Sequence, residues 1–134
     1  MKAIVNGIGG VFIYANDPKS LAEWYSHHLG LEFTCDEGDG NYYMLFYYRD
    51  VDDPSKRLNT VFAIMPADSE LGTTRGEAMI NYRVHDLAAL MAQLTAAGIV
   101  VEEIKVQRDD EGFGKFTHLV DPEGNRIELY QPLR

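Results

Sequence analysis

The chain has 134 residues, of which 46% are hydrophobic and 25% charged, a balance typical of one globular domain that excludes a disordered or low-complexity chain. The 21 acidic and 12 basic residues give a formal net charge of −9, so we expect neither nucleic acid nor an anionic membrane as a partner. The single cysteine, Cys35, excludes an internal disulfide and fits a reducing cytoplasm. No apolar stretch reaches the roughly 18 residues of a membrane helix, and the N-terminus lacks the apolar core of a signal peptide.

The first half of the chain predicts a strand, a helix and three further strands. Residues 11–15 form a short alternating segment. Asp17 and Pro18 then supply an N-cap and a first helical residue, apolar residues recur at helical spacing, and Gly30 ends the helix. The strand-like runs that follow are 31–35, 42–49 and 60–65, with a turn-rich segment at 50–57.

The second half repeats this order. A strand-like segment precedes Asp86, which caps a helix that Gly98 ends. The predicted strands are 80–84, 99–107, 115–120 and 126–131, with turns at 108–114 and 121–125. We therefore predict an α+β fold, built from a duplicated βαβββ unit with mostly antiparallel sheet. The chain is one domain, 1–134, with units at about 7–66 and 77–132 and a joint at 66–76.

Several motifs carry a resemblance to a known family. They are Asp121-Pro122-Glu123-Gly124-Asn125-Arg126-Ile127-Glu128-Leu129, Tyr82-Arg83-Val84-His85-Asp86-Leu87, Ala97-Gly98-Ile99, Gly9-Gly10-Val11, Asp17-Pro18, Trp24-Tyr25 and Leu29-Gly30-Leu31. Taken together in chain order, these motifs resemble the vicinal oxygen chelate superfamily, also called the glyoxalase/bleomycin-resistance/dioxygenase superfamily, over about residues 7–132. The resemblance implies a curved sheet around a concave pocket, helices outside, and a homodimer.

The resemblance also implies a divalent metal in the pocket of the family's enzymes. Its ligands there are His or Glu on the first strand of each unit and Glu on the last strand of each unit. These four positions fall on Gly10, Ala63, Met79 and Glu128. Only Glu128 offers a donor that a hard divalent ion prefers. We therefore expect no metal ion and no other cofactor.

Strand alternation separates two faces of the second unit's sheet. Ile80, Tyr82 and Val84 share the face expected under the helix, whereas Met79, Asn81 and Arg83 share the other. By alternation alone the second face is solvent-exposed, but the resemblance places it inside the pocket. There Asn81, Arg83, His118 and Glu128 would converge, with Tyr130 beside them. An even hairpin register sets His118 opposite Glu128, and an odd register separates them.

The first unit contributes aromatic residues instead. Phe12 and Tyr14 match Asn81 and Arg83, and the run 42–48 adds further rings. An apolar wall with a few placed polar groups is typical of a small-molecule site.

Each polar candidate also has a structural interpretation. Glu128 is a pocket acid or base, or a salt-bridge partner of Arg83 or Arg126. Arg83 clamps an anionic ligand, or serves as the counter-ion of Glu128. His118 transfers a proton, or is a satisfied half-buried histidine.

Three functions follow as hypotheses. The first is metal-independent binding or sequestration of a small molecule, similar to the family's antibiotic-resistance members. Its ligand-binding residues are Phe12, Tyr14, Met79, Asn81, Arg83 and Tyr130. The second is an enzyme, a lyase, isomerase or dioxygenase-like protein, with His118 and Glu128 as the catalytic acid–base pair and Asn81 or Arg83 stabilising an oxyanion. The third is an interaction subunit without a ligand.

Overall fold

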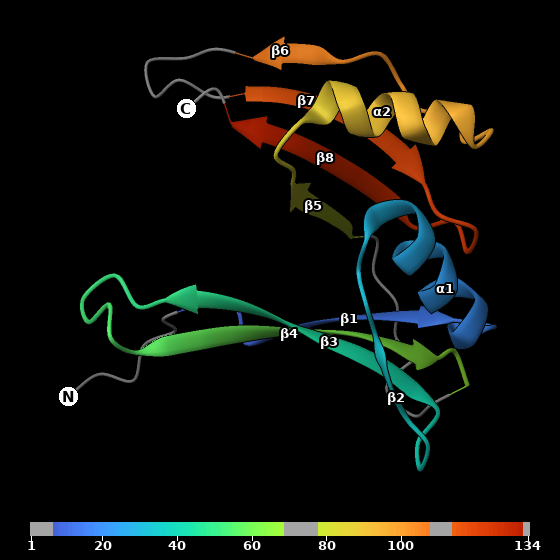
Figure 1. The fold of residues 1–134 in the computed structure, drawn as a ribbon. Helices are drawn as coiled ribbons and strands as arrows, with labels where there is room; N and C mark the ends of the chain where they lie inside the picture. Colours follow the sequence, from blue (N-terminus) through green and yellow to red (C-terminus); the bar gives the residue numbers. More distant parts are fainter. Residues whose placement is uncertain (1–6, 69–77, 108–113, 133–134) are drawn as a thin grey trace. The chain divides into compact units, whose positions relative to one another are not determined.

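The computed structural model describes residues 7–68, 78–107 and 114–132. The predicted order of one strand, one helix and three strands occurs twice (Figure 1). The chain divides into two compact units, Met1–Arg75 and Gly76–Arg134. Each unit has one four-stranded mixed sheet and one helix, so the α+β fold predicted from the sequence is confirmed. Neither described helix is long and apolar enough to span a membrane.

Unit 1 consists of β1 (Gly10–Ala15), α1 (Pro18–Leu29), β2 (Thr34–Asp36), β3 (Asn41–Arg49) and β4 (Arg57–Pro66). The strands lie in the order β1-β4-β3-β2 (Figure 1). β1 runs parallel to β4, and the two other pairs are antiparallel. The crossover through α1 and the β2–β3–β4 meander therefore returns the chain to the side of its first strand.

The ends of α1 follow the predicted signals. The Asp17 carboxylate accepts hydrogen bonds from the Ser20 hydroxyl at 2.8 Å and the Ser20 amide at 3.1 Å. These two bonds, the hydroxyl's first, hold the pKa of Asp17 below its usual 3.8. At the other end Gly30 adopts φ 70°, a left-handed conformation that glycine reaches without strain.

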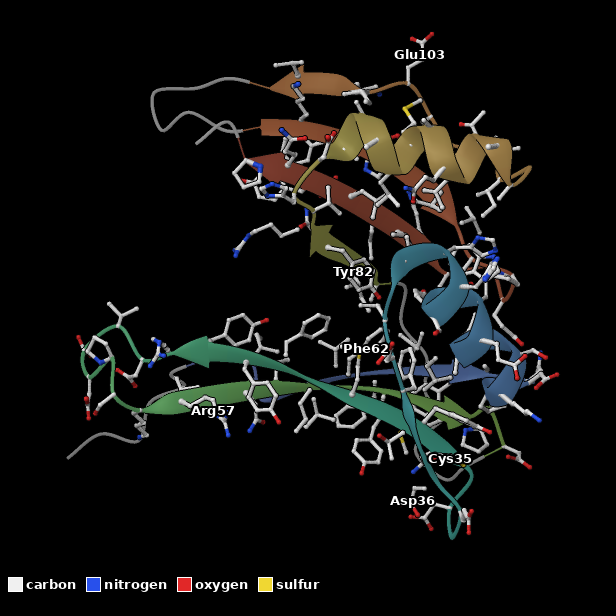
Figure 2. All side chains as sticks on the ribbon, in the orientation of Figure 1. Cys35, Asp36, Arg57, Phe62, Tyr82 and Glu103 are labelled. Atoms are coloured by element: carbon white, nitrogen blue, oxygen red, sulfur yellow. The ribbon has the colours of Figure 1, made fainter. Side chains whose placement is uncertain are left out.

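The core of unit 1 lies between α1 and the sheet. The Tyr25 ring meets the Phe62 ring edge-on, with centroids 5.8 Å apart, and Phe62 lies on the side of β4 that faces α1 (Figure 2). Trp24 is half-buried and packs 5.3 Å from the His28 ring. Burial lowers the pKa of His28 below 6.5, and the neighbouring His27 adds to this effect.

Unit 2 consists of β5 (Met79–Arg83), α2 (Leu87–Ala96), β6 (Lys105–Gln107), β7 (Gly114–Val120) and β8 (Arg126–Pro132). Its strand order, β5-β8-β7-β6, repeats that of unit 1, with β5 parallel to β8. The buried side chains that form its core are Leu87, Leu94, Leu119, Ile127 and Leu129. The amide of Leu87, at the start of α2, donates to the Gln131 side chain at 2.7 Å and ties the helix to β8.

The turn between β7 and β8 is built around one carboxylate. Asp121 is buried and accepts from the amides of Glu123 and Asn125, both at 2.9 Å, and from the Asn125 side chain at 2.8 Å. Gly124 adopts φ 87°. Because this turn has one preferred geometry, it sets the register of the β7–β8 hairpin.

Two predicted strands begin too early. Residues 31–33 are not in a strand, because the amide of Leu31 still bonds back to Tyr25 and closes the helix end. Residues 99–104 are not in a strand either, and β6 begins only at Lys105. The predicted end of the second helix is confirmed, because α2 ends at Ala96 with Ala97 as its cap, and Gly98 follows at φ 81°.

Candidate functional site

The candidate site is the sheet face of unit 2 that α2 does not cover. Side chains alternate along each strand, so Ile127 and Leu129 are buried on the helix side while their neighbours in β8 project from the opposite face. We call this opposite face the helix-free face. The residues that it includes are Met79, Asn81, Arg83, Lys105, Phe116, His118, Val120, Arg126, Glu128 and Tyr130.

Four polar residues form a line across this face. In the sheet register Asn81 lies opposite Glu128, and Glu128 lies opposite His118. The amide of Glu102 donates to the His118 carbonyl at 3.0 Å, which extends the line by one position beyond β7. We call Asn81, Glu128, His118 and Glu102 the polar row. Of the two hairpin registers that the sequence allows, the structure has the one that brings His118 and Glu128 together.

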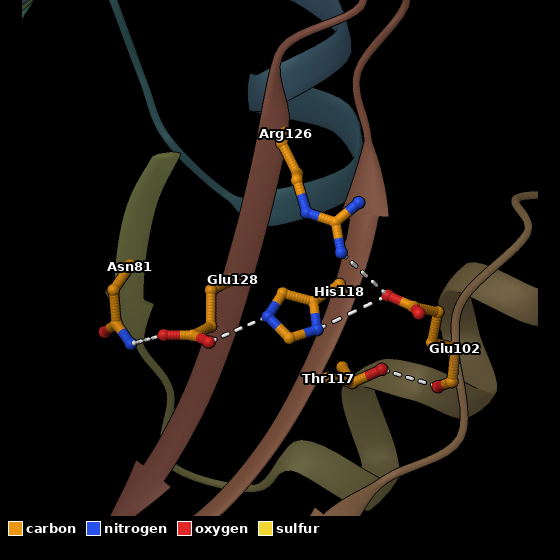
Figure 3. A network of polar contacts seen from close by, with 6 residues as sticks. All are labelled: Asn81, Glu102, Thr117, His118, Arg126 and Glu128. Atoms are coloured by element: carbon orange, nitrogen blue, oxygen red, sulfur yellow. Dashed lines mark hydrogen bonds and ion pairs between the residues drawn. The ribbon is translucent and has the colours of Figure 1, made fainter. Parts of the chain in front are cut away.

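The side chains of the polar row are in direct contact (Figure 3). The Asn81 amide donates to Glu128 Oε1 at 2.6 Å. His118 Nε2 lies 2.7 Å from Glu128 Oε2, and His118 Nδ1 lies 3.3 Å from Glu102 Oε2. The side chains of His118 and Glu128 are each 19% exposed, whereas that of Glu102 is 50% exposed. Of the two contacts of His118, the shorter one is therefore also the more shielded from water.

Two further residues hold the outer end of the row. The hydroxyl of buried Thr117 donates to the Glu102 carbonyl at 2.5 Å, which fixes the backbone of that segment (Figure 3). Arg126 forms an ion pair with the Glu102 carboxylate at 3.5 Å. The predicted salt bridge of Glu128 with Arg83 or Arg126 is therefore wrong: Glu128 pairs with His118, and Arg126 pairs with Glu102.

The bonding pattern limits what the polar row can do. A neutral imidazole has one donor and one acceptor nitrogen, while an imidazolium donates from both. Each ring nitrogen of His118 faces a carboxylate. The two carboxylates can therefore stabilise a positive charge on the ring, or the ring can relay a proton between Glu102 and Glu128. Both oxygens of Glu128 already have partners, so this carboxylate is positioned rather than free to rotate.

A second line of residues runs beside the polar row. Arg83 lies opposite Tyr130, Tyr130 opposite Phe116, and Phe116 opposite Lys105. We call these four residues the aromatic row. The rings of Phe116 and Tyr130 are stacked, with centroids 5.0 Å apart and planes inclined by 22°. On the other side of the polar row, Met79 lies opposite Arg126 and is 44% exposed.

In unit 1 the positions that correspond to the polar row are apolar or aromatic. Phe12 lies opposite Ala63, and Ala63 lies opposite Tyr43, in the register that Asn81, Glu128 and His118 have in unit 2. Phe12 is 54% exposed, and Tyr14, further along β1 on the same face, is half-buried. At these matched register positions, unit 1 therefore has Phe12, Ala63 and Tyr43 where unit 2 has Asn81, Glu128 and His118.

The superfamily positions do not fit a divalent metal. The register confirms that Ala63 stands where unit 2 has Glu128. A Cβ at Gly10 would lie 3.0 Å from the Phe12 ring, so this ring occupies the space that a ligand side chain there would need. In unit 2 the His118 ring stands between its two carboxylates, so their donors do not converge on one point. Within the described ranges no group of three or more His, Cys, Asp or Glu could hold a metal ion.

Sequence reasoning missed three residues of this face. Glu102 follows α2 in a segment without regular structure, and no local pattern indicates its contact with His118. In the sequence, nothing distinguishes Phe116 from other strand residues, because its contact with Tyr130 depends on the strand register. Gly114 matters because a Cβ there would lie 2.6 Å from the Tyr130 ring. Its position just before a predicted strand was the only available signal.

The comparisons with known proteins agree with the fold. The model of the Glyoxalase/Bleomycin resistance protein/Dioxygenase superfamily matches residues 7–129. The chain therefore belongs to this superfamily. A search of curated protein sequences finds no match.

Solved structures with the same fold are only distantly similar in sequence. A virulence protein from Salmonella typhimurium has a TM-score of 0.74 at 16% identity, covering 98% of this chain and 100% of that protein. TnmS3, an antibiotic binding protein from a Streptomyces species, has a TM-score of 0.65 at 20% identity, covering 98% and 99%. Lactoylglutathione lyase from Agrobacterium tumefaciens has a TM-score of 0.58 at 19% identity, covering 95% and 94%.

Proposed function

We propose that this protein binds or sequesters a small molecule on the helix-free face, without a metal ion. The observation that carries the proposal is the make-up of this face in unit 2, where the hydrogen-bonded polar row lies directly beside two stacked aromatic rings. Small-molecule sites combine an apolar wall with a few fixed polar groups. Polar groups that are already oriented lose little freedom when a ligand binds.

Two further observations support the proposal. TnmS3, which shares the fold, is an antibiotic binding protein. Large apolar side chains are also exposed on the same faces, with Phe12 in unit 1 at 54% and Met79 in unit 2 at 44%.

The proposed roles follow from chemistry and place. His118 orients the Glu128 carboxylate, Asn81 presents further amide atoms beside it, Arg83 offers a guanidinium, and Tyr130 offers a flat ring. Met79 contributes apolar surface to this face, and Phe12 and Tyr14 contribute it to the corresponding face of unit 1.

Metal independence rests on the donor set, in which Gly10, Ala63 and Met79 stand at three of the four superfamily positions. We expect purified protein to hold less than one equivalent of any divalent metal. Ligand affinity should be the same with and without a chelator. A tightly bound stoichiometric metal, or affinity lost on chelation, would contradict this part of the proposal.

One observation favours a second function, acid–base catalysis. The 2.7 Å contact between His118 Nε2 and Glu128 Oε2 is the geometry of a proton-transfer pair. Once a ligand is known, turnover can be sought directly. Conversion that is lost in both His118→Ala and Glu128→Gln, with binding retained, would establish an enzyme.

We further propose that the protein is a cytoplasmic homodimer. The exposed free thiol of Cys35 is compatible with a reducing compartment, and each sheet leaves strands at its edges for pairing. Light scattering after gel filtration measures the mass, and cell fractionation locates the protein. A monomer at all concentrations would overturn the dimer.

The main test uses three derivatives of one ring system: 2-naphthoate, 2-naphthamide and 2-naphthylmethylammonium. Each is titrated into the protein by calorimetry, with Tyr130→Leu and Asn81→Ala as variants of the face. Glu103→Ala is the control, because Glu103 is exposed and points away from α2 (Figure 2). We expect at least one derivative to bind, and both face variants to weaken it while the control does not. No binding by any derivative supports the ligand-free interaction subunit instead.

A further inference from the structure

The aromatic row begins and ends with a cation. Arg83 and Lys105 occupy its two ends, and between them lie Tyr130 and Phe116. Neighbouring strands are about 4.8 Å apart, so the two cations are separated by roughly 14 Å at the backbone. In a chain of net charge −9, two positive groups on either side of an aromatic pair form a local exception.

The two rings are held in place by their surroundings. Phe116 and Tyr130 stack at 5.0 Å with nearly parallel planes. The Tyr130 ring also lies over Gly114, at a distance that leaves no room for a Cβ. Rings fixed in this way offer a flat surface on which a further aromatic ring can stack without first ordering the protein.

The Arg83 side chain has no partner within the residues that the structure describes, since no side-chain hydrogen bond or ion pair joins it to any of them. Arg126, on the same face, is by contrast neutralised by Glu102. The nearest carboxylate in the polar row, Glu128, is already engaged by Asn81 and His118. Among the described residues, Arg83 is therefore a guanidinium next to an aromatic stack that no carboxylate neutralises.

We infer that the helix-free face of unit 2 takes a planar aromatic carboxylate. The aromatic ring stacks beside Tyr130 and Phe116, and the carboxylate accepts paired hydrogen bonds from the Arg83 guanidinium. A guanidinium matches a carboxylate in geometry and charge better than an ammonium does, which assigns the anion to Arg83 rather than to Lys105. This inference rests on the proposed ligand-binding function and names the class of ligand.

The charges of the neighbouring row define which end of the ligand goes where. Residues two apart on a strand are about 6.7 Å apart, so a carboxylate at Arg83 avoids direct contact with Glu128. The same separation places Asn81 within reach of a polar substituent on the ring. A cationic ligand would instead meet Arg83 and be repelled.

The test compares the affinities of the three naphthalene derivatives. We expect 2-naphthoate to bind about tenfold or more tightly than 2-naphthamide, because hydrogen bonds to a charged group are worth more than neutral ones. The ammonium derivative should bind weakest. In Arg83→Gln the preference for naphthoate over naphthamide should fall to about twofold or less, while naphthamide keeps its affinity. Arg83→Lys should recover only part of the preference.

Two controls separate the local role of Arg83 from overall charge. Arg126→Gln and Lys105→Gln each remove one positive charge from the same face, and both should leave the preference for naphthoate intact. Equal losses in all three glutamine variants would overturn the inference. If naphthamide or the ammonium derivative binds as tightly as naphthoate and still depends on Tyr130, the ligand class is wrong but the proposed function stands. If none of the derivatives binds, both fail.

Discussion

Replacing Glu128 by alanine removes the acceptor that two other members of the polar row share. The Asn81 amide loses its contact at 2.6 Å, and His118 Nε2 loses its contact at 2.7 Å. Both contacts involve a carboxylate, and a hydrogen bond to a charged group contributes about 1.5–3 kcal/mol. The Glu128 and His118 side chains are each 19% exposed, so water replaces only part of what is lost.

We therefore expect Glu128→Ala to lower the free energy of unfolding by about 2 kcal/mol. Glu128→Gln keeps the volume and a carbonyl oxygen for Asn81, but its amide replaces the charged oxygen facing His118. It should cost about 1 kcal/mol. A double-mutant cycle with His118→Ala should give a coupling energy of about 1 kcal/mol between the two side chains.

Urea unfolding followed by far-ultraviolet circular dichroism measures these differences. Fluorescence alone is unsuitable, because the single tryptophan, Trp24, lies in unit 1 and reports on that unit. Glu103→Ala is the matched control, since it removes an exposed carboxylate next to Glu102 and should change stability by less than about 0.5 kcal/mol. Equal effects of Glu128→Ala and Glu103→Ala would refute the reasoning, as would a coupling energy of zero.

Four further substitutions test other features of the fold. Gly114→Ala forces a Cβ against the Tyr130 ring and the next strand, and should cost about 1–3 kcal/mol in urea unfolding; Gly124→Ala, with open space around it but φ 87°, should cost only about 1 kcal/mol of backbone strain. Asp17→Ala should lower the melting temperature at neutral pH. Because the folded-state pKa of Asp17 is lowered, the difference from wild type should shrink as the pH falls below 3.8, and a pH-independent difference would contradict the cap. The pKa of His28 is lowered, so the folded state binds protons less readily than the unfolded chain and wild type should lose stability as the pH falls through 6.5. His28→Gln should lose less stability over the same pH range. Identical pH profiles of the two proteins would contradict this.

The sequence predicted what depends on local pattern and on the repeat. Alternation along residues 80–84 separated Tyr82 from Asn81 correctly, and the caps Asp17 and Gly30 marked the ends of α1. Strand lengths were predicted less well, because a strand needs a partner as well as a pattern. Residues 99–104 have suitable side chains but remain outside β6.

Strand alternation predicted which face each site residue lies on, but not which residues lie opposite one another. His118 and Glu128 are ten positions apart, and whether they meet depends on the Asp121 turn, which selects one register. Glu102 joins them through a backbone hydrogen bond to β7, a tertiary contact without a sequence signal. The incorrect pairing of Glu128 with an arginine has the same origin, since register determines which neighbour lies opposite.

The matching registers of Phe12–Ala63–Tyr43 and Asn81–Glu128–His118 have an evolutionary consequence. Backbone hydrogen bonds between strands hold both sets of residues in register, and the hydrophobic core of each unit lies on the opposite face of the same strands. Selection can thus rewrite one surface of a duplicated scaffold, exchanging alanine for glutamate or tyrosine for histidine, while the other surface keeps the protein folded. Such a scaffold explores new chemistry in one copy without having to change the other.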